Sequence, residues 1–280
     1  MTAGQMPESN EEVLGPSRIE PLTPGRVGII SAGYTQQWAP VAGQLGVKSL
    51  QDLPGPPNPV DYGLLPFIGF SNQISRAAGC TSQYHVLGNI KDDAGFTHAL
   101  NQMIETEMDL IVWWSLAVAT ARQDAKTRAE IEESMRRGVA RRAIFVYPCF
   151  SGPPLDSPRV IPVAGIVPQP PHLALCPAPP NHPLIPPKIV TWGDWHEFRM
   201  AWKVAGLAGG LPDDSPNMNG HSLATWSIAA WLGLSLNLPA VGRAKLDPDR
   251  MLRGVSVPVN VLPEGTRPRL GHFEPRFPEP

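Results

Sequence analysis

The chain has 280 residues, of which 42% are hydrophobic and 17% are charged, and its formal net charge is −2. This balance of charge excludes proteins that bind nucleic acids through a strongly basic overall composition. Three cysteines in a chain of this length exclude a small domain held together by disulfides, so we expect reduced, buried thiols and a cytosolic compartment. Proline is unusually frequent, with 34 of the 280 residues, where about 5% is typical.

The distribution of proline predicts the domain organisation. A proline-rich N-terminal arm (1–66) precedes a helical core segment (67–147) that contains no proline. A proline-rich, apolar, extended segment (148–187) follows, then a second helical core segment (188–255) and a proline-rich C-terminal arm (256–280). Because proline is excluded from helix interiors, we expect a mainly α fold with minor β, a helical core with long extended N-terminal, central and C-terminal arms.

Apolar periodicity predicts a helix over residues 93–121, capped by Asp92 or Asp93. A second helix is expected over 125–141, with acidic residues early and arginines late, and a short buried strand over 142–148. Further helices are expected over 194–207, over 221–236 and after Asp247.

One apolar stretch raises the question of a membrane span. Residues 222–242 contain no charged residue, and a spanning helix needs about 20 apolar residues. This stretch also contains Asn237, Pro239 and several hydroxyl groups, and it has no basic cluster on one flank only. We expect a buried helix followed by a turn, and no membrane association.

The segment GHSLA (220–224) resembles the G-x-S-x-G nucleophile elbow of α/β-hydrolases. An elbow needs a buried strand directly before the serine, whereas the preceding residues here read as a loop, and Ala224 replaces the last glycine. Ser222 is therefore interpreted as a helix N-cap. A divergent hydrolase-like enzyme around Ser222 and His196 is the alternative function.

Two further clusters are weighed as chemical sites. His172, Cys176 and His182 would supply three metal ligands, but a fourth is not nearby, so we expect neither a metal nor a cofactor. Asp194 and His196 lie in one turn beside tryptophans. Neighbouring helical residues point in different directions, so a helix start with acidic residues explains this cluster without catalysis.

The most charged segment is basic, with seven basic residues against four acidic ones between residues 122 and 142. On a helix, five of the seven share one broad face, which can neutralise phosphates along a nucleic-acid backbone. The alternative is a solvated face with ion pairs four residues apart, such as Glu133 with Arg137. The candidate nucleic-acid-binding residues are Arg122, Lys126, Arg128, Arg136, Arg137, Arg141 and Arg142.

These observations favour a structural protein over an enzyme. The apolar arms and eight tryptophans suggest surfaces that bury themselves against further copies of the chain. We expect a self-assembling viral coat or nucleocapsid-like protein that packages RNA, found in the virion and the host cytoplasm. Its arms would make the contacts between subunits, and the arginine face would bind phosphates. A proline-rich adaptor for aromatic-groove domains is a further alternative.

The composition also resembles a known viral family. Proline, alanine and serine number 34, 26 and 16, and proline supplies most of the excess. In this and in its length, the chain resembles the proline-alanine-serine-rich proteins of polymycoviruses, and filamentous-virus coat proteins more generally. The resemblance implies a protein that coats viral RNA. It rests on no motif, so it assigns no functional residue.

Overall fold

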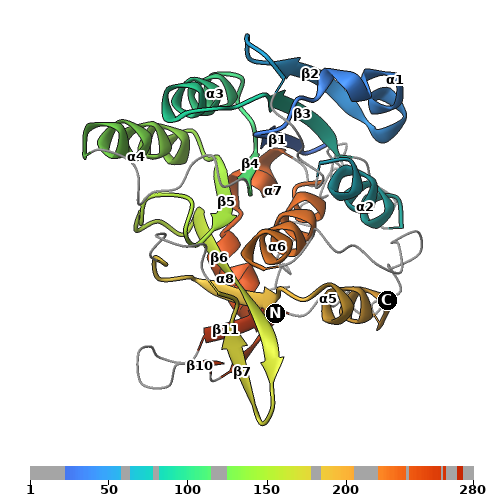
Figure 1. Ribbon diagram of the computed structural model, residues 1–280, viewed down its shortest axis with the longest axis vertical. Coiled ribbons are helices and arrows are strands. Elements are labelled where there is room, and N and C mark those ends of the chain that lie inside the picture. Colours follow the sequence, from blue (N-terminus) through green and yellow to red (C-terminus); the bar gives the residue numbers. More distant parts are fainter. Residues whose placement is uncertain are drawn as a thin grey trace, which may run out of the picture.

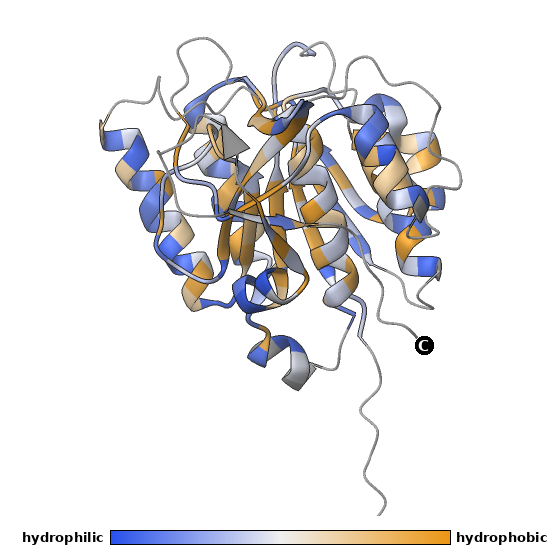
Figure 2. Cartoon of the chain, turned by 90° about the horizontal axis from the view of Figure 1, so that it is seen from below, coloured by the Kyte–Doolittle hydropathy of each residue, from blue (hydrophilic) through white to orange (hydrophobic). Residues whose placement is uncertain are grey.

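The computed structural model describes residues 23–57, 64–77, 82–114, 125–177, 184–204, 220–237, 240–259, 261–262 and 270–273. These residues form three layers, with one sheet between two layers of helices (Figure 1). Figure 2 shows that the sheet is mostly hydrophobic, whereas the outer surfaces of the helices are mostly hydrophilic.

The sheet has eleven strands, nine of them in the order β2-β3-β1-β4-β5-β6-β8-β11-β9. Neighbours from β2 to β11 run parallel, while β9 is antiparallel to β11 and β7 is antiparallel to β6. The strands are β1 (Arg26–Ile30), β2 (Val47–Asp52), β3 (Gln83–Gly88), β4 (Leu110–Trp113), β5 (Ile144–Pro148), β6 (Val160–Gln169), β7 (His172–Leu175), β8 (Ile189–Trp192), β9 (Ser256–Val259), β10 (Val261–Leu262) and β11 (Leu270–Phe273).

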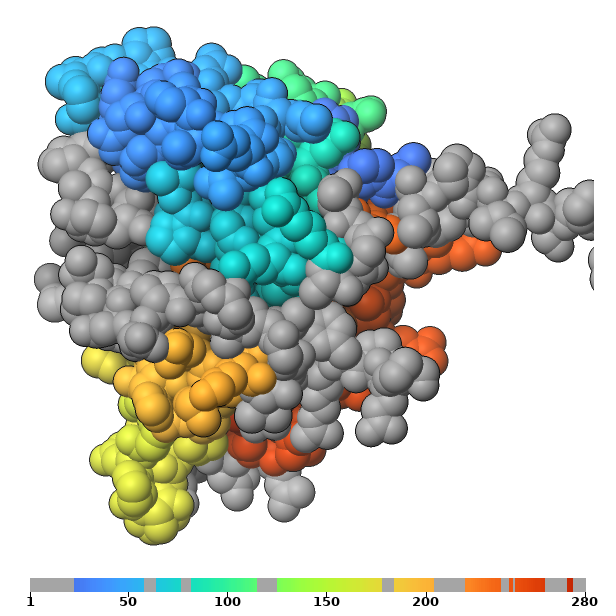
Figure 3. Space-filling model, turned by 90° about the vertical axis from the view of Figure 1, so that its right-hand side faces the viewer, coloured from blue at the N-terminus to red at the C-terminus, as the bar shows by residue number. Residues whose placement is uncertain are grey.

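Helices cover both faces of this sheet. One face packs against α2, α5 and α6, and the other against α3 and α4. Figure 3 shows α1, α2 and α5 at the surface of the molecule. The helices are α1 (Ala39–Ala42), α2 (Leu64–Ala77), α3 (Asp93–Glu105), α4 (Ala125–Ala140), α5 (Trp195–Val204), α6 (His221–Ser235), α7 (Ala240–Lys245) and α8 (Pro248–Gly254).

The expectation of a mainly α fold with extended proline-rich arms was wrong. The chain is an α/β domain built on a mostly parallel sheet. The central proline-rich segment supplies β6, whose first seven residues are all buried between β5 and β8. Apolar residues between the prolines therefore belong to the core, because a parallel strand covered on both faces is hydrophobic throughout.

Pro162 shows how a central strand tolerates proline, which ordinarily argues against such a position. Its carbonyl accepts a hydrogen bond from the amide of Lys188, and its pairing with β8 begins only one residue later, where Val163 meets Ile189. The nitrogen of Pro162, which has no hydrogen to donate, therefore faces residues that precede β8 and are not part of that strand. No ladder hydrogen bond is lost at this position.

Several predicted elements are confirmed and one is wrong. The helix expected over 125–141 is α4, the strand expected over 142–148 is β5, and the uncharged stretch from residue 222 begins in the buried helix α6. The helix expected over 93–121 ends at Glu105, and β4 follows it. Of the helices in the described part of the chain, none combines the length and hydrophobicity that crossing a membrane requires.

Two consecutive crossover connections have opposite hands. The connections β2–α2–β3 and β3–α3–β4 step in the same direction along the sheet. Phe67 of α2 packs with Val86 on one face, whereas Phe96 of α3 packs with Leu87 on the other. About 98% of such connections are right-handed, so one of these two is the rare exception. As a result α2 lies beside α6 on one face (Figure 1).

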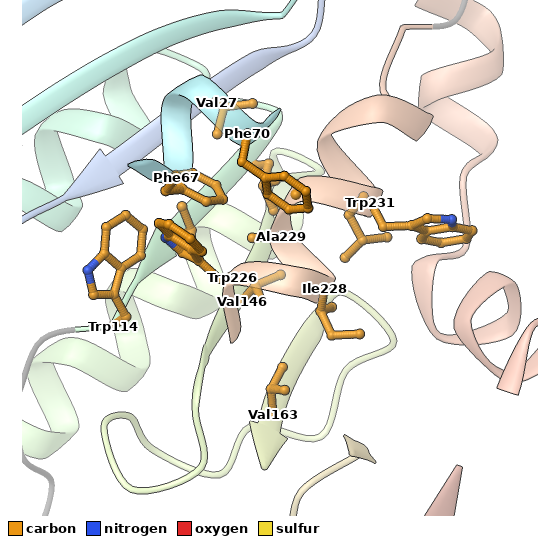
Figure 4. Packing of buried hydrophobic residues seen from close by; sticks show 14 of the residues in the cluster. Val27, Phe67, Phe70, Trp114, Val146, Val163, Trp226, Ile228, Ala229 and Trp231 are labelled. Carbon is orange, nitrogen blue, oxygen red and sulfur yellow. The ribbon is translucent and has the colours of Figure 1, made fainter. Parts of the chain in front are cut away.

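Helix α6 is the centre of the larger core. Twelve of its fifteen residues are buried, so it has no polar face. Trp226 and Trp231 leave α6 on opposite sides, and Trp226 joins a cluster with Phe67, Phe70 and Trp114 (Figure 4). The indoles and phenyl rings in this cluster meet at centroid distances of 5.1 to 6.2 Å, which are favourable for aromatic packing.

Asp92, one of the two N-cap candidates from the sequence, is the N-cap of α3. Its side chain accepts a hydrogen bond from the amide of Gly95 at 2.7 Å. Replacing Asp92 with alanine is expected to lower the free energy of unfolding by about 1 kcal/mol, because a first-turn amide loses its partner. Urea unfolding would measure this change. Asp93→Ala is the control, and a loss as large in the control would contradict the capping role.

Candidate active site

The most distinctive site lies at the carboxyl edge of the parallel strands. In open α/β sheets, ligands bind at this edge, where the strand order departs from the chain order. Here β1 lies between β3 and β4, which is such a point. Helix α2 follows β2 in the chain, and α6 begins beside the end of β8, where the amide of Gly220 donates to the carbonyl of Gly193. The hydroxyl of Ser222, in the first turn of α6, donates to the carbonyl of Trp114 directly after β4 at 3.0 Å.

Three glycines fix the start of α6 against the sheet. Gly165 lies in β6, Gly193 follows β8, and Gly220 is the N-cap of α6. A Cβ at Gly165 would lie 2.7 Å from the Gly220 carbonyl oxygen, and one at Gly193 would lie 2.9 Å from it. The amide of Gly220 donates to the carbonyl of Gly193 at 2.6 Å. Backbone meets backbone here, so side chains would force α6 away from the strands.

Gly220 also needs its own freedom, because its φ is +82°, a conformation that residues with a Cβ rarely adopt. Helix α6 begins at the next residue, His221, and Ser222 is its second residue. The first amides of a helix have no partner inside the helix, and they carry its partial positive charge. The start of α6 therefore presents backbone donors beside a serine hydroxyl. Ser222 itself is half-buried.

His221 anchors the same turn from inside. Its Nδ1 accepts a hydrogen bond from the amide of Gly165 at 3.0 Å, which places the ring proton on Nε2. The side chain is 2% exposed, and no hydrogen-bond partner of Nε2 is found among the described residues. Burial lowers the pKa of His221 to about 4, against a weaker opposing effect of the Cys176 backbone. The imidazole is therefore neutral at pH 7.

Cys149 lies beside this histidine, with 3.8 Å between its Sγ and Nδ1 of His221. A cysteine and a histidine in contact can form a nucleophile and base pair. Here both side chains are buried, and Nδ1 is already occupied by the Gly165 amide. The pair is therefore part of the core. Cys149 and Cys176 are both buried thiols, as expected, and burial raises the pKa of Cys176 to about 12.

The helices and strands around Ser222 carry different kinds of side chains. Helix α2 begins with apolar residues, and β1 is followed by Ser31, whose hydroxyl accepts from the Gly33 amide. Asp52, at the end of β2, accepts three hydrogen bonds from the backbone and side chain of Thr35 and one from the Gln36 amide. Within the described residues, no histidine or carboxylate is hydrogen-bonded to the Ser222 hydroxyl.

Ser222 was interpreted from the sequence as a helix N-cap, and this interpretation was wrong. Gly220 is the N-cap, and Ser222 lies in the first helical turn. Residues 205–219, where the sequence predicted a loop in place of the strand that a nucleophile elbow needs, lie outside the described residues. The sequence did not identify Gly165 and Gly193. Gly165 lies within an apolar segment and Gly193 directly follows one, and neither pattern indicates that both residues approach Gly220, which is far from them in the sequence.

Of the other two candidate clusters, the structure describes only the one at Asp194 and His196 in full. The Oδ1 atom of Asp194 accepts from the amides of His196 and Glu197, which confirms the helix-start interpretation. His172 is exposed in β7, Cys176 is buried, and His182 lies outside the described residues. In the described part of the chain, no three potential metal ligands come together.

The structure separates the predicted nucleic-acid-binding residues into two groups. Lys126, Arg128, Arg136 and Arg137 lie on α4. Lys126 pairs with Glu130 and Arg136 with Glu132, while Arg137 donates to Asn101 of α3 at 2.7 Å. Arg141 and Arg142 follow α4 and line a separate cavity. Arg122 lies outside the described residues, and nucleic-acid binding by this set stays a sequence-based prediction.

Comparison with known proteins gives similarity in structure alone. No protein-family model and no curated protein sequence matches the chain. The prenylagaramide maturation protease PagA is 14% identical, with 85% of this chain and 86% of that one covered and a TM-score of 0.49. The PatG macrocyclase in complex with peptide is 12% identical, with 85% of each chain covered and a TM-score of 0.47. The nisin leader peptidase NisP from Lactococcus lactis is 14% identical, with 87% and 86% covered and a TM-score of 0.47.

The prediction of a non-enzymatic viral coat protein was therefore wrong, and with it the resemblance to polymycovirus proteins. That prediction depended on a helical core with apolar arms, and the central arm is instead a core strand of an α/β domain. Solved structures to which the chain is similar include a protease, a macrocyclase and a peptidase. The segment that would be the ligand of a proline-rich adaptor, residues 177–187, lies partly outside the described residues, so that alternative stays a sequence-based prediction.

Proposed function

We propose that the chain is an acyl-transfer enzyme, which cleaves or transfers the acyl group of an amide or ester with Ser222 as its nucleophile. One observation carries this proposal. Ser222 is a half-buried hydroxyl in the first turn of a buried helix, fixed by three glycines at the carboxyl edge of a parallel sheet. This is the edge at which α/β domains place their chemistry.

The chemistry follows from this position. The Ser222 oxygen would attack the carbonyl carbon, a C–O bond would form to the serine, and the bond to the leaving nitrogen or oxygen would break. Negative charge develops on the carbonyl oxygen, and amides at a helix N-terminus stabilise such an oxyanion. The hydroxyl proton passes to the leaving group.

Transfer of the Ser222 proton to a base requires the hydroxyl group to change its orientation. In the structure the Ser222 hydroxyl donates to the Trp114 carbonyl, which is not basic enough to take the proton. The hydroxyl must turn away from Trp114 for attack, and a base must then accept its proton. None of the described side chains is given this role. The neutral ring of His221 is directed into the core by its hydrogen bond to Gly165.

Labelling with a fluorophosphonate probe tests the proposal, because such probes react covalently with activated serine hydroxyls. We expect the wild-type chain to be labelled at Ser222, as located by peptide mass spectrometry, and Ser222→Ala to lose the labelling. Ser235→Ala is the matched control. It removes the same atom from the last turn of α6, where the hydroxyl donates to the Trp231 carbonyl at 3.1 Å, and it should be labelled like the wild type.

A hydrolysis assay with an activated ester and an amide substrate completes the test. We expect turnover to fall by a factor of about 10³ or more in Ser222→Ala, since the nucleophile is lost. Unchanged turnover and labelling in Ser222→Ala, with both proteins folded by circular dichroism, would refute the assignment. The absence of both labelling and turnover in the wild type would refute it as well.

A further inference from the structure

A second site lies at the opposite, amino edge of the sheet. A cavity of about 310 Å³ opens there, just before β4, β5 and β6 begin. Its volume lies at the lower end of the range for small-ligand sites. Four arginines and two acidic residues are among the residues that line it. The lining residues are Glu107, Met108, Asp109, Arg141, Arg142, Arg159, Leu236 and Arg243.

One of the two carboxylates is already neutralised. Oδ2 of Asp109 accepts from the Arg243 guanidinium at 2.9 Å and from the amide of Arg26 at 2.8 Å. Arg243 also donates to the carbonyl of Pro24 and to the hydroxyl of Thr23. The pair is partly buried and therefore forms a fixed, neutral wall of the cavity. The acidic group that remains in the lining is Glu107.

A third arginine is held in place by backbone carbonyls. The guanidinium of Arg159 donates to the carbonyl of Arg142 at 2.7 Å and to that of Leu246 at 2.8 Å. These carbonyls fix the orientation of the group. Burial, and then the charge of Arg142, lowers the pKa of Arg159, and Asp247 acts in the opposite direction. Two guanidinium groups therefore repel one another at this edge.

Arg141 and Arg142 bring the remaining positive charge. Arg141 makes one long hydrogen bond of 3.4 Å to the carbonyl of Ile104. In the described part of the chain, neither Arg141 nor Arg142 forms an ion pair with a carboxylate. Arg142 has a φ of +69°, so the turn that ends α4 directs two consecutive arginines to the same edge. A positive φ at a residue with a Cβ costs conformational free energy, which the binding of a charged ligand would offset.

We propose that this cavity binds a phosphate group, as inorganic phosphate or as a small phosphate monoester. The lining carries an excess of two positive charges, and a phosphate monoester carries about −1.5 to −2 near pH 7. Guanidinium groups match phosphate oxygens through paired hydrogen bonds. The site is on the edge of the sheet opposite Ser222, so the proposal does not depend on the acyl-transfer function.

Calorimetric titration of the full chain tests this site. The probes are inorganic phosphate and glycerol 3-phosphate, at constant ionic strength set with sodium chloride. We expect the double variant Arg141→Gln/Arg142→Gln to bind roughly tenfold more weakly or worse, because two charged donors are lost. Both side chains are exposed, so the variant should fold. Arg136→Gln, which removes a charge from α4 outside the cavity, should bind like the wild type.

The two probes distinguish the source of the phosphate group. Binding of both assigns the site to the phosphate group itself, and binding of inorganic phosphate alone assigns it to the free anion. Binding of the ester alone assigns the site to a phosphorylated ligand. If neither binds at millimolar concentration, or if the double variant binds as tightly as Arg136→Gln, the proposal is overturned.

Discussion

Replacing Gly165 with alanine is expected to lower the free energy of unfolding by about 3 kcal/mol. The added Cβ would lie 2.7 Å from the Gly220 carbonyl oxygen and 2.8 Å from its carbon. Both are backbone atoms, so no side-chain rotation relieves the contact. Either β6 or the start of α6 must shift, and Ser222 moves with α6. If the acyl-transfer function holds, labelling of Ser222 by the fluorophosphonate probe should also be lost.

Gly69→Ala is the matched control for this change, because a Cβ at Gly69 in α2 meets no atom within 4 Å. Alanine in a helix interior is more favourable than glycine, so the control should gain up to about 1 kcal/mol. Urea unfolding of both variants measures the difference. Equal stability of Gly165→Ala and Gly69→Ala would show that the close approach of α6 to the strands is not required.

Cys176 contributes differently to the effects of alanine at Gly165 and at Gly193. A Cβ at Gly193 would meet the Cys176 sulfur first, at 2.4 Å, whereas at Gly165 the sulfur is only the third neighbour. Adding Cys176→Ala should therefore restore part of the stability lost in Gly193→Ala and little of that lost in Gly165→Ala. Similar rescue of both would mean that the sulfur, and not the backbone of Gly220, limits the approach.

Local patterns predicted local elements well. The ends of helix α4 were predicted to within one residue, because its charged and its apolar residues both recur at helical spacing. Strand β4 was missed, because Leu110, Ile111, Val112 and Trp113 are all apolar and continue the helical pattern of α3. A fully buried parallel strand has no alternation by which it could be distinguished from a buried helix. The turn between α3 and β4 contains Glu107, which has a positive φ.

The fold class was mispredicted for a different reason. The proline-rich segment 148–187 was taken as an extended arm, whereas part of it is the core strand β6, which accommodates Pro162 because β8 begins only beside Val163. That register depends on a partner strand about 25 residues later in the chain. The site shows the same limit. Ser222 was noticed, but its place at the sheet edge depends on contacts with Gly165 and Gly193 that no local pattern contains.

The stability of the domain is expected to fall as the pH drops from about 6.5 to about 4, because of His221. Burial holds its pKa in the folded chain at about 4, while the unfolded chain has the ordinary value of 6.5. Between these values the unfolded chain binds a proton that the folded chain does not, so protons favour unfolding. Above pH 6.5 the contribution is fully present. Below about pH 4 it is lost, with a total of about 3 kcal/mol.

Urea unfolding of wild type and His221→Asn across this pH range isolates the effect. In the variant, the amide oxygen of the new asparagine side chain would occupy roughly the place of Nδ1 and accept from the Gly165 amide, but it does not titrate. The pKa of His85 is also lowered by burial, and this contribution is common to both proteins. The two stability curves should therefore converge as the pH falls, since only the wild type loses the His221 contribution. Parallel curves would contradict the burial of a neutral imidazole beneath the start of α6, and with it the anchor that holds Ser222 at the edge of the sheet.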